Sequence, residues 1–115
     1  MPDAQFPACV RLRQAAQFKA VFGAGQRHND ASFTVIYLPQ KKSQARLGMV
    51  VSKKVSRLAV QRNRIKRQIR ESFRQHRHTL PNGDLVVMAR YRAAQQDNRA
   101  LSQSLQRHWQ RLARL

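Results

Sequence analysis

The 115-residue sequence carries 23 lysine and arginine residues against five acidic ones, a formal net charge of +18 at pH 7, and 42% of its residues are hydrophobic. This length and hydrophobic content predict one folded domain over residues 1–115, and the positive charge predicts a polyanionic partner, a nucleic acid rather than an anionic membrane. The sequence shows no apolar run long enough to span a membrane and no secretion signal, so we expect a cytoplasmic protein with no membrane partner.

The N-terminal part of the sequence predicts an irregular arm followed by a short helix. Residues 1–12 contain two prolines, and the helix is expected from Gln14 to Phe22, with two glycines following closely. Phe18 and Phe22 lie one helical turn apart on its apolar side. This spacing favours two core rings, although a ring at the edge of a core can also stack on a nucleobase.

Three apolar segments predict strands. Ser32 to Leu38 alternates, with Phe33 and Tyr37 on one side, and Arg46 to Ser52 forms the second segment. We expect these two strands to pair as an antiparallel hairpin. The third segment, from Asp84 to Arg90, follows a helix and is therefore expected to run parallel to one strand of that hairpin.

The most informative stretch is a basic helix expected from about Leu58 to His78. Apolar residues recur along one side of a 3.6-residue repeat, so this side is expected to enter the core. The opposite side carries an amide and a column of guanidinium groups, which suit phosphate oxygens, although a basic helix face is more often simply solvated. The apolar side consists of Leu58, Ile65, Ile69 and Phe73, and the column consists of Asn63, Arg67, Arg70 and Arg74, with Lys66 and Arg77 at its edges.

The remaining segments complete the predicted order of elements. Ser52-Lys53-Lys54 reads either as a solubilising loop or as a phosphate clamp beside the start of the basic helix. Asp97 or Asn98 is expected to cap a last helix, in which Trp109 is a core anchor of the stripe Leu101, Leu105, Trp109 and Leu112. The order helix, strand, strand, helix, strand, helix predicts an α+β fold in which helices pack on a small sheet.

The sequence shows no set of residues suited to catalysis or metal binding. Its five carboxylates are scattered, so the paired acidic groups that hold Mg²⁺ in metal-dependent nucleases cannot be assembled. The four histidines lack partners at zinc-ligand spacing, the single Cys9 cannot form an internal disulfide, and no glycine-rich phosphate loop occurs. We therefore expect a binding protein with no catalytic residue and no metal of its own.

The string from Arg62 to Arg74 resembles the signature of the protein subunits of bacterial ribonuclease P. Matches continue on both sides in the same order, and the segment from Asp97 to Leu115 resembles the proteobacterial branch. The other matching residues are Arg11-Leu12, Phe18, Val21-Phe22, Arg46-Leu47-Gly48, Val51-Ser52-Lys53-Lys54, Asp84-Leu85-Val86-Val87, Ala89-Arg90, Leu101, Leu105 and Trp109.

This resemblance implies a single RNA-binding domain that serves as the protein cofactor of a ribonucleoprotein endonuclease. In that family a catalytic RNA removes the 5′ leader from precursor tRNA, and the Mg²⁺ ions are held mainly by the RNA. The implied fold is α+β with a small mixed sheet in the order α-β-β-(β)-α-β-α. Its parallel strands are joined by a left-handed crossover through the central helix, whereas most such crossovers are right-handed.

The resemblance also implies two RNA-binding sites. The single-stranded leader is expected in a cleft between the first helix and the sheet, lined by Phe18, Phe22 and one of Phe33 or Tyr37. Lys53 and Lys54 are expected near this cleft. The residues implied to face the catalytic RNA are Arg62, Asn63, Lys66, Arg67 and Arg70, with Arg64 and Arg74 as additions.

The residues by themselves leave two other functions open. A ribosomal or double-stranded nucleic-acid-binding protein would use the same basic helix but would bind many RNAs equally. A stand-alone nuclease would cleave precursor tRNA with no RNA subunit present.

Overall fold

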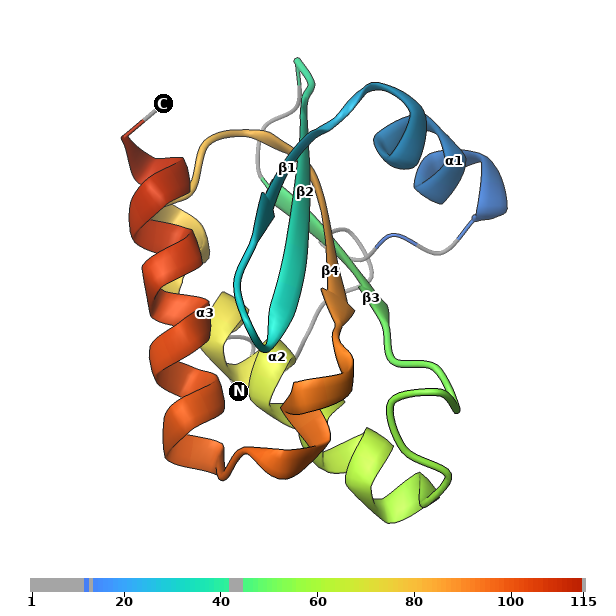
Figure 1. Ribbon diagram of the computed structural model, residues 1–115. Coiled ribbons are helices and arrows are strands. Elements are labelled where there is room, and N and C mark those ends of the chain that lie inside the picture. Colours follow the sequence, from blue (N-terminus) through green and yellow to red (C-terminus); the bar gives the residue numbers. More distant parts are fainter. Residues whose placement is uncertain (1–11, 13, 42–44, 115) are drawn as a thin grey trace, which may run out of the picture.

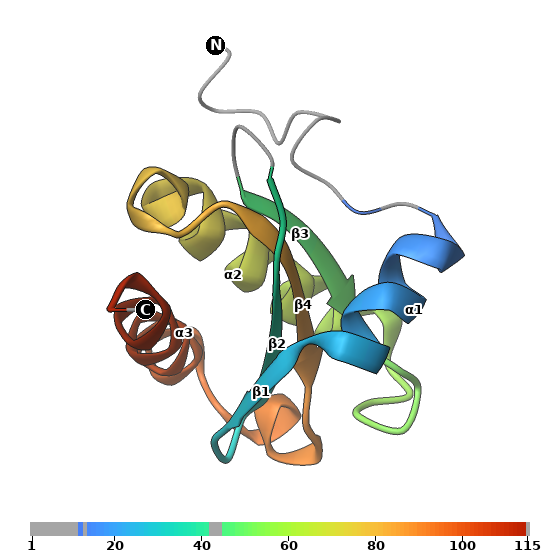
Figure 2. The same ribbon diagram turned by 90° about the horizontal axis from the view of Figure 1, so that it is seen from above.

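In the computed structural model, which describes residues 12, 14–41 and 45–114, helices cover both faces of a four-stranded sheet (Figure 1). Helix α1 lies on one face, and helices α2 and α3 lie on the other (Figure 2). The helices are α1 (Ala15–Ala24), α2 (Ala59–His76) and α3 (Asn98–Ala113), with short 3₁₀ helices η3 (Arg77–Thr79) and η4 (Tyr91–Gln95), and the strands are β1 (Gln26–Asn29), β2 (Phe33–Pro39), β3 (Ala45–Val50) and β4 (Gly83–Ala89). The predicted α+β class with a small mixed sheet is confirmed.

The strand order β1-β2-β4-β3 corrects one predicted pairing. Strand β4 runs antiparallel to β2 and parallel to β3, so it lies between them. The antiparallel hairpin predicted between Ser32–Leu38 and Arg46–Ser52 is therefore wrong. Instead β2 forms its hairpin with β1, a short polar strand that has no apolar alternation to predict it.

The parallel pairing predicted for the third strand is confirmed, since β3 and β4 pair in parallel with α2 between them in sequence. With β1 included, three strands precede α2, which agrees with the order α-β-β-(β)-α-β-α. The left hand of the crossover through α2 stays a prediction.

The larger apolar core lies between the sheet and helices α2 and α3. Ile65, Ile69 and Phe73 are fully buried there, as their spacing in α2 predicts. Trp109 of α3 packs edge-on against Phe73 at a ring-centroid distance of 6.1 Å, and its indole N–H donates to Ser72 Oγ at 2.7 Å. This buried hydrogen bond fixes α3 against α2 and confirms Trp109 as a core anchor.

Leu58 does not share the buried side of α2. It is the N-cap residue, has extended backbone angles and is 62% exposed. Because the helical repeat begins only at Ala59, the angular spacing that aligns the later residues does not extend to this position. The prediction that Leu58 belongs to the apolar stripe is wrong for this reason.

A smaller core lies on the opposite face, beneath α1. Val21 of α1 is fully buried against Ile36 of β2 and Val86 of β4. Strand β2 alternates as expected, so Phe33, Val35 and Tyr37 enter the larger core while Ile36 and Leu38 face α1. The sheet therefore separates α1 from α2 completely, and any surface on α1 opens on the other side of the molecule.

An ion pair joins the two parallel strands near their N-terminal ends. Arg46 donates through Nε and Nη2 to the two carboxylate oxygens of Asp84, at 2.8 and 2.9 Å. The Asp84 side chain is 3% exposed and that of Arg46 is 18% exposed. Such a two-point contact fixes the register of β3 on β4, in which these two residues are direct partners.

We predict that Asp84→Asn lowers the free energy of unfolding by about 3 kcal/mol, because the Arg46 charge loses this buried counter-charge. Urea denaturation measures this change. The paired variant Arg46→Met with Asp84→Leu serves as a control, since it removes both charges together and is expected to recover part of the loss. An Asp84→Asn variant as stable as the original chain would contradict the role assigned to this pair.

A second polar cluster attaches the β1–β2 hairpin to α3. The Asp30 carboxylate accepts hydrogen bonds from the backbone N–H groups of Ser32 and Phe33 at 2.9 and 2.8 Å, which shapes the turn. The same carboxylate accepts a hydrogen bond from Ser104 Oγ of α3. His108 is buried beside it, with Nε2 3.4 Å from the carboxylate. One acidic side chain thus links a turn to a helix distant in sequence.

Both titratable groups in this cluster have lowered pKa values, for opposite reasons. Burial lowers the pKa of His108 more than the neighbouring Asp30 raises it. Burial alone would raise the pKa of Asp30, yet hydrogen bonds from Ser104, Phe33 and Ser32 outweigh it and hold this pKa below its usual value. A lowered pKa means that the folded chain binds the proton less readily than the unfolded chain, so acidification favours unfolding.

We predict that the melting temperature falls as the pH drops from about 7.5 to about 5.5, because the unfolded histidine, with a pKa of about 6.5, takes up protons first. Loss of the Asp30 contribution follows only below about pH 4. His108→Gln should reduce the first decline, to which His28, whose pKa is lowered by burial and by Arg111, contributes the remainder. His78→Gln, at an exposed position, should leave the decline unchanged. A melting temperature that rises on acidification would contradict this assignment.

Candidate nucleic-acid interface

Burial of the apolar side of α2 turns its opposite side to solvent. Asn63 and Arg67 are exposed, and Lys66, Arg70 and Arg74 are partly exposed. The structure therefore brings the predicted column together on the outer side of a single helix. A rigid helix holds these groups in a fixed spacing, so a polyanion meets a preformed array of donors.

Three of the predicted α2 residues are held by neighbouring groups. Arg62 Nη1 donates to the carbonyl oxygens of Ser56 and Arg57 at 2.9 and 3.0 Å, and thereby braces the loop that precedes the helix. Arg64 Nη1 donates to Asn98 Oδ1 at 2.9 Å, which ties α2 to the start of α3. The Arg74 guanidinium pairs with Glu71 at 2.9 Å. These contacts orient the three side chains and take up part of their hydrogen-bonding capacity.

The other cations of the column are available to bind a partner. Within residues 14–41 and 45–114, no group accepts a hydrogen bond or forms an ion pair with the side chains of Lys66, Arg67 or Arg70. Arg67 also lines an open depression of about 410 Å³ between α2 and the start of α3, together with Asn63 and Arg64. Arg67 and Arg70 are therefore the best-placed phosphate ligands of the helix.

The N-terminal end of α2 adds to the positive field. Its first turn carries no acidic side chain, and no side chain caps its free backbone N–H groups. The helix dipole places partial positive charge at this end, close to the exposed Lys54 and Arg57 of the preceding loop. Positive charge therefore continues from the N-terminal end of α2 into the loop that precedes it.

The rings of Phe18 and Phe22 lie on the α1 face of the sheet. Both are partly buried, with ring centroids 6.4 Å apart. Gly48 of β3 allows Phe18 to lie close to the strand, because a Cβ at this position would come within 2.6 Å of the ring. The two rings therefore close the smaller core and remain partly exposed, as both the core and the stacking interpretations require.

The structure does not bring Phe33 or Tyr37 to this face. Phe33 is fully buried in the core beneath α2 and α3, and Tyr37 is 5% exposed there. The Tyr37 hydroxyl donates to the Asn82 carbonyl oxygen at 2.7 Å, and burial raises its pKa. The prediction that one of them lines a cleft with Phe18 is wrong in its placement, since alternation along β2 presents Ile36 instead.

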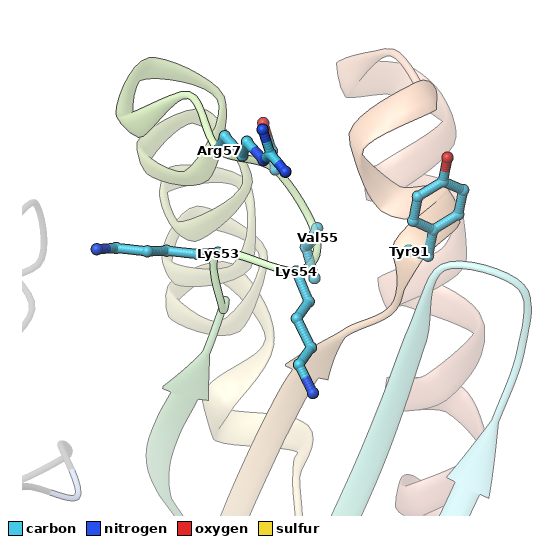
Figure 3. Close-up of a pocket in the computed structure, with 6 residues that line it drawn as sticks. Lys53, Lys54, Val55, Arg57 and Tyr91 are labelled. Atoms are coloured by element: carbon cyan, nitrogen blue, oxygen red, sulfur yellow. The ribbon is translucent and has the colours of Figure 1, made fainter.

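Lys53 and Lys54 are exposed in the loop between β3 and α2, which is anchored by the buried Val51 and Val55. Their side chains diverge, and Lys54 lies on the side of Tyr91 (Figure 3). Both lysines line an open pocket of about 660 Å³ that Arg57 and Tyr91 also line. The structure thus joins the two predicted lysines to two residues that sequence reasoning left without a role.

Tyr91 is the residue in this region that the sequence analysis missed. It lies two residues beyond the end of β4, at the start of η4, and is 67% exposed. The signal that could have revealed it is an aromatic residue between Arg90 and Arg92, just beyond a buried strand. An exposed ring among basic residues is a common feature of surfaces that bind single-stranded nucleic acid.

The described residues form neither a metal site nor a membrane-spanning helix. Among the described residues, no three histidine, cysteine or acidic side chains come close enough to share a metal ion. In the same residues, no helix is both long and apolar enough to cross a membrane.

Comparisons with known proteins give one consistent result. The family model described as Ribonuclease P matches residues 6–113. A relative from Thioalkalivibrio sulfidiphilus, named ribonuclease P protein component, is 46% identical over 96% of this chain and 92% of its own length. A protein of the same name from Salmonella arizonae is 44% identical, with the same two coverages.

Solved structures agree with these relatives. The RNase P protein from Staphylococcus aureus superposes with a TM-score of 0.82 at 33% identity, covering 90% of this chain and 94% of that one. The RNase P protein from Thermotoga maritima superposes with a TM-score of 0.78 at 30% identity, covering 88% of this chain and 96% of that one.

We predict that the double variant Arg67→Gln, Arg70→Gln weakens binding to a structured RNA. It should also make the negative slope of log affinity against log salt shallower by about 2, or about 1 per lost phosphate contact. A salt titration of binding measures the slope. The matched control, Arg27→Gln with Arg114→Gln, removes the same charge from exposed positions outside α2 and should change the slope less. Equal changes in both pairs would mean that only the overall charge matters.

Proposed function

Because the chain belongs to the ribonuclease P protein family and is thus a protein component of that enzyme, we propose that it is the non-catalytic cofactor of a catalytic RNA. The holoenzyme would remove the 5′ leader from precursor tRNA by endonucleolytic hydrolysis. The observation that carries this proposal is a helix with one side buried and, on its outer side, the exposed Arg67 and the partly exposed Arg70. Neither has an ion-pair or hydrogen-bond partner among the described residues. The same proposal keeps the cytoplasmic location expected from the sequence.

The two faces of the sheet support a division of labour between two RNAs. The outer side of α2 would bind the catalytic RNA, because its column of cations matches a folded phosphate backbone. The α1 face would bind the single-stranded leader, with Phe18 and Phe22 stacking on bases and Lys53 and Lys54 contacting phosphates. Since the sheet separates the two surfaces, one protein domain could hold both RNAs at once.

The carboxylates support an active site on the RNA rather than on the protein. Each described carboxylate already has a structural partner: Asp84 pairs with Arg46, Glu71 pairs with Arg74, Asp30 anchors the hairpin, and Asp97 caps α3 through the Ala100 N–H. These groups come from different elements and do not fit a shared Mg²⁺ site. The Mg²⁺ ions of the reaction would therefore be held mainly by the RNA, and the protein would raise affinity by reducing phosphate repulsion.

The test of this function is reconstitution. The protein should restore cleavage of precursor tRNA by a bacterial ribonuclease P RNA at a Mg²⁺ concentration too low for the RNA alone, and it should bind this RNA in preference to unrelated structured RNAs. Equal binding to all of them would favour a general RNA-binding protein. Cleavage by the purified protein without RNA would favour a stand-alone nuclease.

We predict that two substitutions separate the two surfaces. Arg67→Ala should weaken assembly with the catalytic RNA by about 1–3 kcal/mol, the cost of a lost charge-assisted hydrogen bond. Phe22→Ala should leave assembly unchanged and weaken binding of precursor tRNA by about 1–3 kcal/mol, the contribution of one stacked base. Separate titrations of catalytic RNA and of leader-bearing substrate measure the two effects.

Phe22 is partly buried, so its variant needs a control for folding. Mature tRNA, which has no leader, should bind the Phe22→Ala holoenzyme as tightly as the original one. If both variants lost affinity for the catalytic RNA and for the leader-bearing substrate to the same extent, the division of labour would be contradicted.

A further inference from the structure

The open pocket beside Tyr91 is a built feature of the fold. One wall is the loop with Lys54 and Arg57, and the other is Tyr91 at the start of η4 (Figure 3). Its volume of about 660 Å³ lies within the range of about 300–1,000 Å³ found for pockets that hold small organic groups. The pocket is wide open on one side, which suits one unit of a long chain better than an enclosed small molecule.

Both walls are held by contacts beneath the surface. Arg62 braces the loop through two carbonyl oxygens, and Val55 is buried below it. On the other side, Arg90 is fixed by its backbone N–H to Ser32 and by its guanidinium to the Asp30 carbonyl oxygen, at 2.8 and 2.6 Å. The ring of Tyr91 therefore stands on a rigid backbone and loses little conformational freedom when a ligand binds.

The ring has no structural role that would explain its exposure. It is 67% exposed and packs in neither of the two cores. Its hydroxyl has no hydrogen-bond partner in the part of the chain that the structure describes. An exposed aromatic face with an ammonium and a guanidinium group across the pocket matches a nucleotide, which offers a base to stack and a phosphate to pair.

We propose that this pocket binds one unpaired nucleotide of the precursor tRNA leader, with its base stacked on Tyr91 and a phosphate held by Lys54 and Arg57. This inference rests on the proposed function. The pocket lies just beyond the C-terminal ends of the parallel strands β3 and β4, at the loop that leads from the sheet into α2. A leader that leaves the α1 face toward a catalytic RNA on α2 passes this point, so the bound nucleotide lies between the cleavage site and the nucleotides at Phe22.

The experiment uses the full chain assembled with the catalytic RNA. Affinities are measured for three ligands: the catalytic RNA with the protein, and precursor tRNA and mature tRNA with the holoenzyme. The variants are Tyr91→Ala, which removes the ring, and Tyr91→Phe, which keeps it. A series of precursors, each with one abasic leader position, locates the nucleotide. Where a base stacks on Tyr91, the binding free energies lost by removing the base and by removing the ring should not add, because both changes remove the same contact.

Tyr91→Ala should weaken precursor binding about 5- to 150-fold, the equivalent of one stacked base, and should leave catalytic-RNA and mature-tRNA binding unchanged. Tyr91→Phe should bind like the original chain. One abasic position should abolish the effect of Tyr91→Ala, and it should differ from the position that couples to Phe22→Ala.

Unchanged precursor binding by Tyr91→Ala would overturn the inference, as would an equal loss for mature tRNA. A loss in catalytic-RNA affinity would assign the pocket to the RNA subunit and would likewise overturn it. A different result, in which the original holoenzyme shows no preference for precursor over mature tRNA, would overturn the proposed leader function itself.

Discussion

The burial of one side of helix α2 determines which side chains the helix presents to solvent. Ile65, Ile69 and Phe73 cannot leave the core without exposing a large apolar area, so the helix cannot rotate about its axis. Its opposite side is thereby fixed toward solvent, and Arg67 and Arg70 stay together there. The Trp109–Ser72 hydrogen bond reinforces this orientation from α3. A stable core thus produces a preformed array of positive charge.

The distribution of the few acidic residues follows the same logic. With a formal charge of +18, the chain has far too few carboxylates to neutralise its cations. Asp84, Asp30 and Asp97 are all used for structure: a strand pair, a turn attached to a helix, and a helix cap. The surface of α2 is therefore left largely uncompensated, and a polyanion relieves the repulsion among its cations. Folding and RNA binding share one charge distribution in this account.

Much of this could be predicted from the sequence, and the failures have physical causes. Spacing located α2, and the specific string from Arg62 to Arg74 indicated the family. Alternation identifies β2 but does not tell which of its faces meets which helix. One of Phe33 or Tyr37 was therefore expected on the α1 face, where Ile36 lies instead. The residues of a strand do not show which other strand it pairs with. The predicted antiparallel hairpin was wrong for this reason, and the polar strand β1, which pairs with β2 instead, was not predicted. Tyr91 has a role only when the loop across the pocket is known.

The most direct test of the central claim is arginine-specific chemical modification of the protein, followed by mass spectrometry, with and without the catalytic RNA. The account predicts that Arg67 and Arg70 react readily in the free protein and become protected in the complex, while Arg27 and Arg114 stay reactive in both. Arg67 and Arg70 that remain reactive in the assembled complex, or protection spread equally over all four arginines, would contradict it.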